Sequence, residues 1–134
     1  MGQSMAIGTA RPVLVVDDDQ AIRTAVSWAL SDAGYWVTTA EHGRAALVQV
    51  ADAPPALVLL DMRMPVMDGW TFARHYRALV TDHAPIVVMT AAYDARDRAA
   101  QIEANGHLAK PFDSTELLNT VRHHLPHEDL NADA

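Results

Sequence analysis

The chain has 134 residues, a size typical of one domain, and half of them are hydrophobic, which suffices for a packed core. The formal net charge of −7 argues against nonspecific binding to nucleic acid or to anionic membranes, because both need a basic surface. The lack of cysteine excludes disulfides and thiolate chemistry and fits a cytoplasmic protein. No apolar run is long enough to span a bilayer, so membrane insertion is not expected.

Short apolar runs alternate with helical patterns along the chain. The apolar runs predict strands at 12–17, 35–40, 56–61, 85–90 and 107–110. The segments between and after them predict helices at about 20–33, 43–52, 70–80, 93–104 and 114–125. This alternation predicts an α/β fold, in which a five-stranded parallel sheet carries five helices on its two faces. We expect one domain over residues 12–125, with flexible segments at 1–11 and 126–134.

Local signals refine the helix ends and the core. Asp19 is positioned to cap the first helix, and Asp113 or Ser114 to cap the last. The tryptophans are expected to be buried or partly buried packing residues, and an exposed one would indicate a partner surface. They are Trp28, Trp36 and Trp70.

Polar side chains stand where the predicted strands end. Asp17 and Asp18 follow the first strand, Asp61 closes the third, Thr90 the fourth and Lys110 the fifth. Ligands of open parallel sheets bind at the carboxyl ends of the strands. The fold would therefore bring three carboxylates, one hydroxyl and one ammonium into one crevice, although they lie far apart in the chain.

The chemistry of this set indicates a phosphoryl-transfer site. Clustered carboxylates are unfavourable unless a proton or a cation neutralises them, and magnesium prefers oxygen ligands. A lysine can hold a phosphoryl oxygen, and a hydroxyl can donate to another. Each residue alone has a simpler explanation, because an acidic pair often caps a helix and a lysine is usually solvated. Their joint placement favours moving a phosphoryl group onto a carboxylate.

Four sequence blocks carry a family resemblance. They are VVDDD at 15–19, LLDMRMPVMDG at 59–69, VVMTA at 87–91 and LAKPF at 108–112. With these blocks in this order, residues 12–125 resemble the receiver domain of two-component response regulators, the CheY-like superfamily. The resemblance implies the flavodoxin-like strand order 2-1-3-4-5. It also implies a stand-alone signalling switch that catalyses its own phosphorylation and dephosphorylation but is not a metabolic enzyme.

The resemblance also implies a metal site and a phosphoacceptor. Asp61 would accept the phosphoryl group. Mg²⁺ would be bound directly by Asp18, largely through water by Asp17, and also by Asp61 and the backbone carbonyl of Arg63. By the same resemblance, Asp17 and Asp18 are gathered to hold this cation beside Asp61.

Further roles follow from the same resemblance. Thr90 would be the switch hydroxyl that moves onto the phosphoryl group, Lys110 would take part in the transfer, and a cis peptide bond would precede Pro111. The phosphodonor would be a histidine kinase or a histidine phosphotransfer protein. The downstream target would be an unknown protein that binds the surface of the fourth helix, fifth strand and fifth helix, and a homodimer is possible.

The chain departs from the family pattern near the switch. The family usually carries an aromatic residue three positions before the lysine, where this chain has His107. Imidazole is smaller, polar and titratable near neutral pH, so we expect a weaker or pH-sensitive coupling to the output surface. Arg63 and Ala92 stand two residues after Asp61 and Thr90, at positions that flank the phosphoryl group in the family.

Other classes of protein remain as alternatives. A pseudo-receiver would bind partners without phosphorylation; the intact acidic set counts against it, and His107 leaves it open. A hydrolase with an aspartyl nucleophile would need a second acid where this chain has Arg63. A flavin-binding protein would need a loop rich in glycine and hydroxyl groups after the first strand, where this chain has acids.

Overall fold

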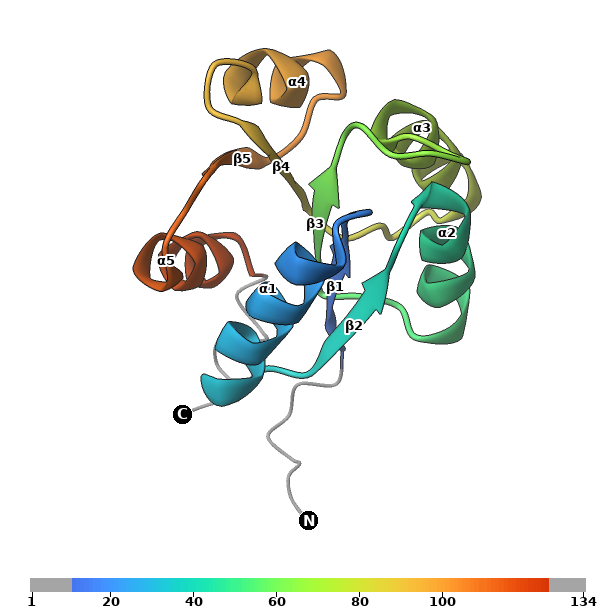
Figure 1. Ribbon diagram of the computed structural model, residues 1–134. Coiled ribbons are helices and arrows are strands. Elements are labelled where there is room, and N and C mark those ends of the chain that lie inside the picture. The colour runs from blue at the N-terminus through green and yellow to red at the C-terminus, as the bar shows by residue number, and fades with distance from the viewer. Residues whose placement is uncertain (1–10, 126–134) are drawn as a thin grey trace.

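The computed structural model describes residues 11–125 and contains one five-stranded sheet with helices on both sides (Figure 1). The strands are β1 (Val13–Val16), β2 (Val37–Ala40), β3 (Leu57–Asp61), β4 (Ile86–Ala91) and β5 (Gly106–Lys110). The helices are α1 (Gln20–Asp32), α2 (Gly43–Asp52), α3 (Gly69–Leu79), α4 (Ala95–Gln101) and α5 (Ser114–His124). The segments expected to be flexible, 1–11 and 126–134, lie outside the described residues except for Arg11. Within 11–125, no helix is long and apolar enough to cross a membrane.

All neighbouring strands of the sheet are parallel, and their order is β2-β1-β3-β4-β5. This confirms both the predicted α/β class and the strand order implied by the resemblance. The order reverses between β1 and β3, because the chain moves from β1 outward to β2 and then returns to the other side of β1. Such a reversal is where open parallel sheets bind their ligands.

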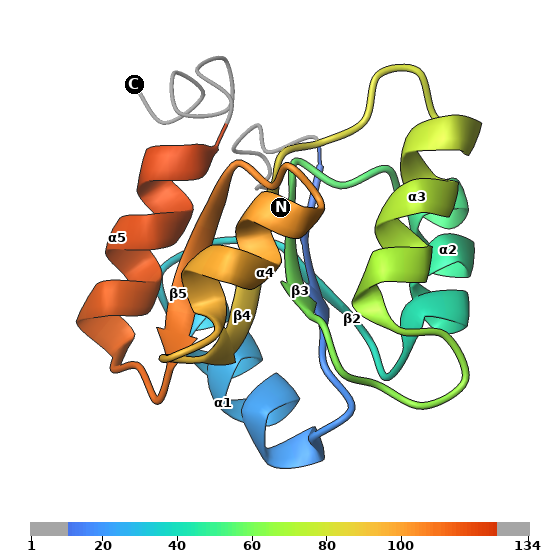
Figure 2. The same ribbon diagram turned by 90° about the horizontal axis from the view of Figure 1, so that it is seen from above.

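Helices cover the two faces of the sheet in separate layers (Figures 1 and 2). The layer of α1 and α5 packs on the face that carries Val13 and Val15 of β1. The layer of α2, α3 and α4 packs on the face that carries Leu14 and Val16. Since both faces are buried, β1 needs apolar residues at every position, which explains the uninterrupted run in the sequence.

Two of the expected helix caps are present. The Asp19 side chain accepts a hydrogen bond from the backbone N–H of Ala21 at 2.9 Å, at the start of α1. Asp113 rather than Ser114 caps α5, and it forms a reciprocal capping box with Glu116. Asp19 therefore caps α1, as its position in the sequence predicted.

The fourth helix is shorter than the predicted span of 93–104. At its start, the Asp94 side chain makes no capping hydrogen bond. At its end, Glu103 has a φ of 53°, a left-handed conformation that stops helical propagation. Asn105 then pairs with Ile86, accepting from its N–H at 2.9 Å through Oδ1 and donating to its carbonyl at 2.8 Å. These contacts draw the chain into β5 instead of a further helical turn.

The expectation for the tryptophans was wrong at two of three positions. Trp28 is 76% exposed and Trp36 is 47% exposed. On α1 the buried side is filled by residues such as Val26, and a residue two positions further along a helix points away from that side. Trp70 is half-buried, and its Nε1 donates to Oε1 of Gln101 at 2.7 Å.

Candidate functional site

The candidate site lies at the carboxyl ends of the strands. Asp17 directly follows β1, and Asp61 and Lys110 are the last residues of β3 and β5. The register pairs Asp61 with Met89, so Thr90 lies one position further along β4, at the same edge of the sheet. The fold thus brings to one edge the residues that the sequence had placed at separate strand ends.

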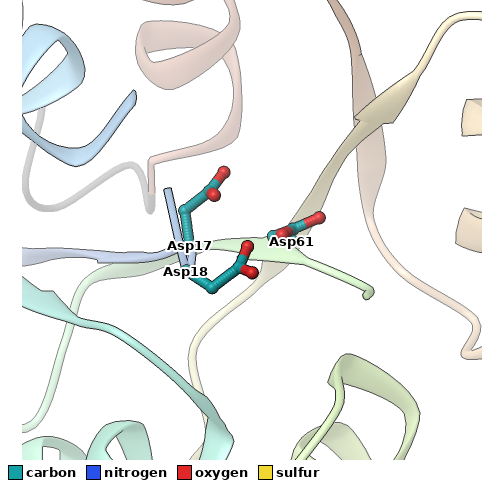
Figure 3. Close-up of side chains that lie close together, drawn as sticks. All are labelled: Asp17, Asp18 and Asp61. Carbon is teal, nitrogen blue, oxygen red and sulfur yellow. The ribbon is translucent and has the colours of Figure 1, made fainter. Parts of the chain in front are cut away.

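Three carboxylates come together at this edge (Figure 3). Asp17, Asp18 and Asp61 each offer an oxygen, and these oxygens all lie within 4.8 Å of one another. Asp17 is fully buried, Asp61 is 6% exposed, and Asp18 faces solvent. The cluster is therefore closed on one side and open on the other.

Asp17 is held through all of its polar groups. Its N–H donates to the carbonyl of Ala40 at 3.1 Å. Its Oδ1 accepts from the N–H of Asp19 at 3.0 Å, and its Oδ2 accepts from Nζ of Lys110 at 2.7 Å. Its carbonyl accepts from Nη1 of Arg23 at 2.6 Å. A buried carboxylate with this many partners is fixed in orientation.

The environment of Asp61 favours its protonated form. Burial, first, and then the negative charge of Asp17 raise the pKa of Asp61 to about 7, and a hydrogen bond that protonated Asp61 makes to the carboxylate of Asp18, together with the charge of Asp18, adds to this. The positive charge of Lys110 acts in the opposite direction. A group of acids that pushes one of its members toward protonation is a group that a cation would stabilise. Carboxylate oxygens suit a hard divalent ion, so these residues fit a metal ion chemically.

Lys110 lies between the two buried acids. Its Nζ is 2.7 Å from Oδ2 of Asp17 and 3.8 Å from Oδ1 of Asp61. The ammonium is therefore close to both carboxylates, and it could also contact an oxygen of a group attached to either of them. The peptide bond that follows, Lys110–Pro111, is cis, as the resemblance implied.

Thr90 and His107 lie on one face of the sheet. The register pairs Val88 with His107 and Thr90 with Ala109, and residues paired in a parallel ladder share a face. Val88 packs into the core under α2, α3 and α4, so this is the α4 side of the sheet. Thr90 is 6% exposed, whereas His107 faces solvent.

The loop that follows Asp61 is tightly packed against two helix starts. The N–H of Gly69 donates to the carbonyl of Met62 at 2.9 Å, and the N–H of Gly43 donates to the carbonyl of Met67 at 2.8 Å. A Cβ on Gly69 would lie 2.8 Å from the backbone oxygen of Asp61, which leaves no room for a side chain. The Arg63 side chain is exposed in this loop, and the role expected for its carbonyl stays a prediction.

One contact of the site was missed by sequence reasoning. Arg23 on α1 reaches back to the carbonyl of Asp17. The spacing of six residues places an arginine at the end of the first turn of α1, close to the acids, and this closeness is a signal that the sequence contains.

A doubly wound sheet with an acidic cluster and a lysine at its carboxyl edge defines an α/β domain of the flavodoxin-like type that can bind a cation. The sequence profile of the response regulator receiver domain matches residues 13–122, and the chain therefore belongs to this family. A receiver domain is a signalling module rather than a classical enzyme, and it implies a cognate histidine kinase. The acidic cluster and Lys110 are consistent with a phosphoacceptor switch.

Individual relatives agree with this assignment. Response regulator MprA of Mycolicibacterium vanbaalenii is 41% identical over 112 residues, which are 82% of this chain and 48% of that protein. The chain thus spans about half the length of the curated relatives it matches. Chemotaxis protein CheY4 of Vibrio cholerae is 36% identical with a TM-score of 0.78, covering 87% of this chain and all of that one. The receiver domain of NtrX from Brucella abortus is 29% identical with a TM-score of 0.77, covering 84% and 97%.

Proposed function

We propose that this chain is a phosphoacceptor switch in which Asp61 receives a phosphoryl group from a phosphohistidine. The observation that carries the proposal is the position of Asp61. It is a nearly buried carboxylate with two further acids within 4.8 Å and the ammonium of Lys110 at 3.8 Å. Such a carboxylate can act as a nucleophile where its surroundings also bind the charge of a phosphoryl group.

Magnesium is the ion that suits this donor set in a phosphoryl-transfer site. Asp18 and Asp61 would hold it directly, Asp17 through water, and the carbonyl of Arg63 would complete the protein ligands. When bound, the ion would neutralise negative charge on the phosphoryl oxygens. Its positive charge also favours the ionised form of Asp61, the form that attacks.

The transfer itself uses the side chains of Asp61, Lys110 and Thr90. One oxygen of Asp61 forms a bond to phosphorus while the bond from phosphorus to the donor imidazole breaks. Lys110 leaves Asp17 and binds a phosphoryl oxygen, a short movement because its ammonium already lies between the two acids. The hydroxyl of Thr90 donates to another phosphoryl oxygen. Water later cleaves the acyl phosphate, which regenerates Asp61 and releases phosphate.

The output surface is formed by α4, β5 and α5. Movement of Thr90 toward the phosphoryl group opens space on the α4 side of the sheet, the face that also carries His107. A rearrangement of His107 would then change what this surface binds. Because imidazole is smaller than the usual aromatic ring and is polar, we infer a weaker coupling to the output surface. Equal partner binding by wild type and His107→Tyr, with and without phosphate, would exclude this role.

The phosphodonor surface lies on α1 beside the acidic cluster. A donor must cover the surface around Asp61 to deliver its phosphohistidine, and α1 begins immediately after Asp18 and Asp19. An apolar hollow next to the site runs from α1 to the segment after β5. Its lining includes Ile22, Ala25, Val26, Lys110, Pro111 and Phe112. Ala25 and the exposed indole of Trp28 line a second hollow on α1, so we assign this surface to the histidine kinase or phosphotransfer protein.

A pseudo-receiver that binds partners without phosphorylation is the second candidate. It is favoured by His107 at the position where the family usually has an aromatic residue. The two functions are separated by adding beryllofluoride, a stable phosphate mimic, with magnesium, and recording amide NMR spectra. A phosphoacceptor shows magnesium-dependent shifts at Thr90 and Lys110, and these shifts are absent in Asp61→Asn. A pseudo-receiver shows no change.

A further inference from the structure

Arg23 connects α1 to the acidic cluster. It is half-buried, and its Nη1 donates to the carbonyl oxygen of Asp17 at 2.6 Å. Its backbone N–H donates to the carbonyl of Asp19 at 3.0 Å, as part of the first turn of the helix. The side chain thus bends back from α1 over the turn that carries all three consecutive acids, and neither the metal ligands nor the transfer step uses it.

The carbonyl of Asp17 needs a donor because it lies just beyond the strand. The ladders from β1 to β2 and to β3 both end at Val16. Asp17 is nonetheless fully buried, so water does not reach its carbonyl. A buried carbonyl without a donor is unfavourable. Arg23 supplies the hydrogen bond, and as a cation it makes a stronger one than a neutral donor would.

The contacts of Asp17 differ in what happens to them during phosphorylation. Those with Ala40, Asp19 and Arg23 involve the backbone of the turn or its neighbours and do not take part in the transfer. The contact with Lys110 is lost if the ammonium moves to the phosphoryl group. Asp17 would then keep its place through the remaining contacts, of which Arg23 is the one made by a side chain outside the turn.

We propose that Arg23 is a positioning residue for the metal site, a role that rests on the proposed function. It fixes the peptide between Asp17 and Asp18, so that both carboxylates stay close to Asp61 while Lys110 changes partner. Its hydrogen bond and its charge have opposite effects on cation binding. The hydrogen bond orients the ligands and strengthens binding, whereas the positive charge repels the ion.

These two effects are distinguished by whether the affinity for Mg²⁺ falls or rises when Arg23 is replaced. The dissociation constant for Mg²⁺ is measured by calorimetry, at one pH and ionic strength, for wild type, Arg23→Met and Arg23→Lys. Methionine removes both donor and charge, and lysine retains a donor and the charge on a side chain that is one bond shorter. We expect Arg23→Met to bind Mg²⁺ about tenfold more weakly, as is typical when a group that orients a metal ligand is lost, and Arg23→Lys to recover most of the affinity.

Arg77 provides a matched control. It is also a half-buried arginine that donates to backbone carbonyls, those of Ile102 and Glu103, but it does so between α3 and α4. Arg77→Met therefore loses a similar set of bonds away from the acids. We expect its affinity for Mg²⁺ to equal that of wild type, even where its melting temperature falls as far as that of Arg23→Met.

The possible outcomes are separable. Binding by Arg23→Met that equals or exceeds that of wild type would overturn the positioning role and leave the phosphoacceptor function untouched. Mg²⁺ binding that is weakened equally in Arg77→Met would also overturn it, because the lower affinity would then result from a general loss of stability. Wild type that binds no Mg²⁺ and takes up no phosphoryl group would overturn both the proposed function and this inference.

Discussion

The ammonium of Lys110 pairs with Asp17, at 2.7 Å, and lies further from Asp61, at 3.8 Å. The lysine is therefore bound to a proposed metal-binding acid rather than to the proposed phosphoacceptor. This arrangement keeps Asp17 neutralised while Asp61 is free of phosphate. It also means that Lys110 must break one ion pair in order to bind a phosphoryl oxygen.

Replacement of Lys110 should separate phosphoryl transfer from metal binding. Lys110→Met removes the ammonium that would hold the phosphoryl oxygen, and we expect phosphorylation by acetyl phosphate to slow about a hundredfold. Mg²⁺ binding should be retained or tightened, because a positive charge beside the acids is gone. Rates from intact mass and affinity from calorimetry test the two halves. A parallel loss of both would mean that Lys110 holds the site together rather than serving the transfer.

The stability of the protein without metal should depend on pH through Asp61. Its pKa is about 7 in the folded protein and 3.8 when unperturbed, so between these values the folded state holds a proton that the unfolded state has lost. The stabilisation from this proton is complete below about pH 4 and is lost as the pH rises through about 7. At about pH 8 we expect Asp61→Asn to melt about 5 °C above wild type, and this difference should shrink toward pH 5. A difference that is constant with pH would contradict the raised pKa.

Magnesium binding should release a proton near neutral pH. A bound cation favours the carboxylate form of Asp61, so below about pH 7 the ion must displace a proton. We expect the apparent affinity for Mg²⁺ to fall by up to about tenfold for each pH unit below 7. Calorimetry in two buffers with different ionisation enthalpies counts the protons released. Asp61→Asn is the control and should release none.

Substitutions at two glycines should separate an effect on the candidate site from an effect on the stability of the fold alone. Gly69→Ala would place a Cβ 2.8 Å from the backbone oxygen of Asp61 and 2.6 Å from Sδ of Met62. We expect a loss of about 1–3 kcal/mol in the free energy of unfolding, together with weaker Mg²⁺ binding, because the backbone at Asp61 must shift. At Gly34 a Cβ meets nothing within 4 Å, but φ is 98°. Gly34→Ala should therefore cost about 1 kcal/mol through backbone strain and leave Mg²⁺ binding unchanged. Equal binding by both variants would show that the loop does not position Asp61.

The exposed side of α1 should matter for a protein donor and not for a small one. Trp28 is 76% exposed and lies on the helix that begins beside the acids. We expect Trp28→Ala to slow phosphotransfer from the cognate histidine kinase about tenfold or more, as for a buried aromatic at an interface. Phosphorylation by acetyl phosphate should be unchanged. The kinase is found by profiling purified kinases of the source organism, and Trp36→Ala serves as the control. A variant slowed equally with both donors would place the defect in the fold instead.

Much of the fold and site could be predicted because each element carries its own local signal. The buried strands β1 and β3 are apolar up to a polar residue that directly follows β1 and ends β3, and the parallel topology brings both of these residues to one edge. The sequence alone therefore predicts that Asp17, Asp61 and Lys110 lie close together. Their joint presence in sequence blocks of the receiver family made the inference specific.

The features that could not be predicted depend on contacts between elements. The exposure of Trp28 depends on which side of α1 faces the sheet. The hydrophobicity of tryptophan alone suggests a buried position, whereas Trp28 is exposed. The early end of α4 comes from the pairing of Asn105 with Ile86, a tertiary contact that overrides helical propensity. The contact from Arg23 to Asp17 depends on the turn between β1 and α1, whose conformation the sequence does not specify.

The most direct test of the central claim is the intact mass of the protein after incubation with acetyl phosphate and Mg²⁺. We expect wild type to gain one phosphoryl group only when Mg²⁺ is present, and Asp61→Asn to gain none. Wild type that remains unmodified, with no response to beryllofluoride either, would contradict the phosphoacceptor function and favour a pseudo-receiver. A phosphoryl group that appears equally on Asp61→Asn would contradict the assignment of Asp61.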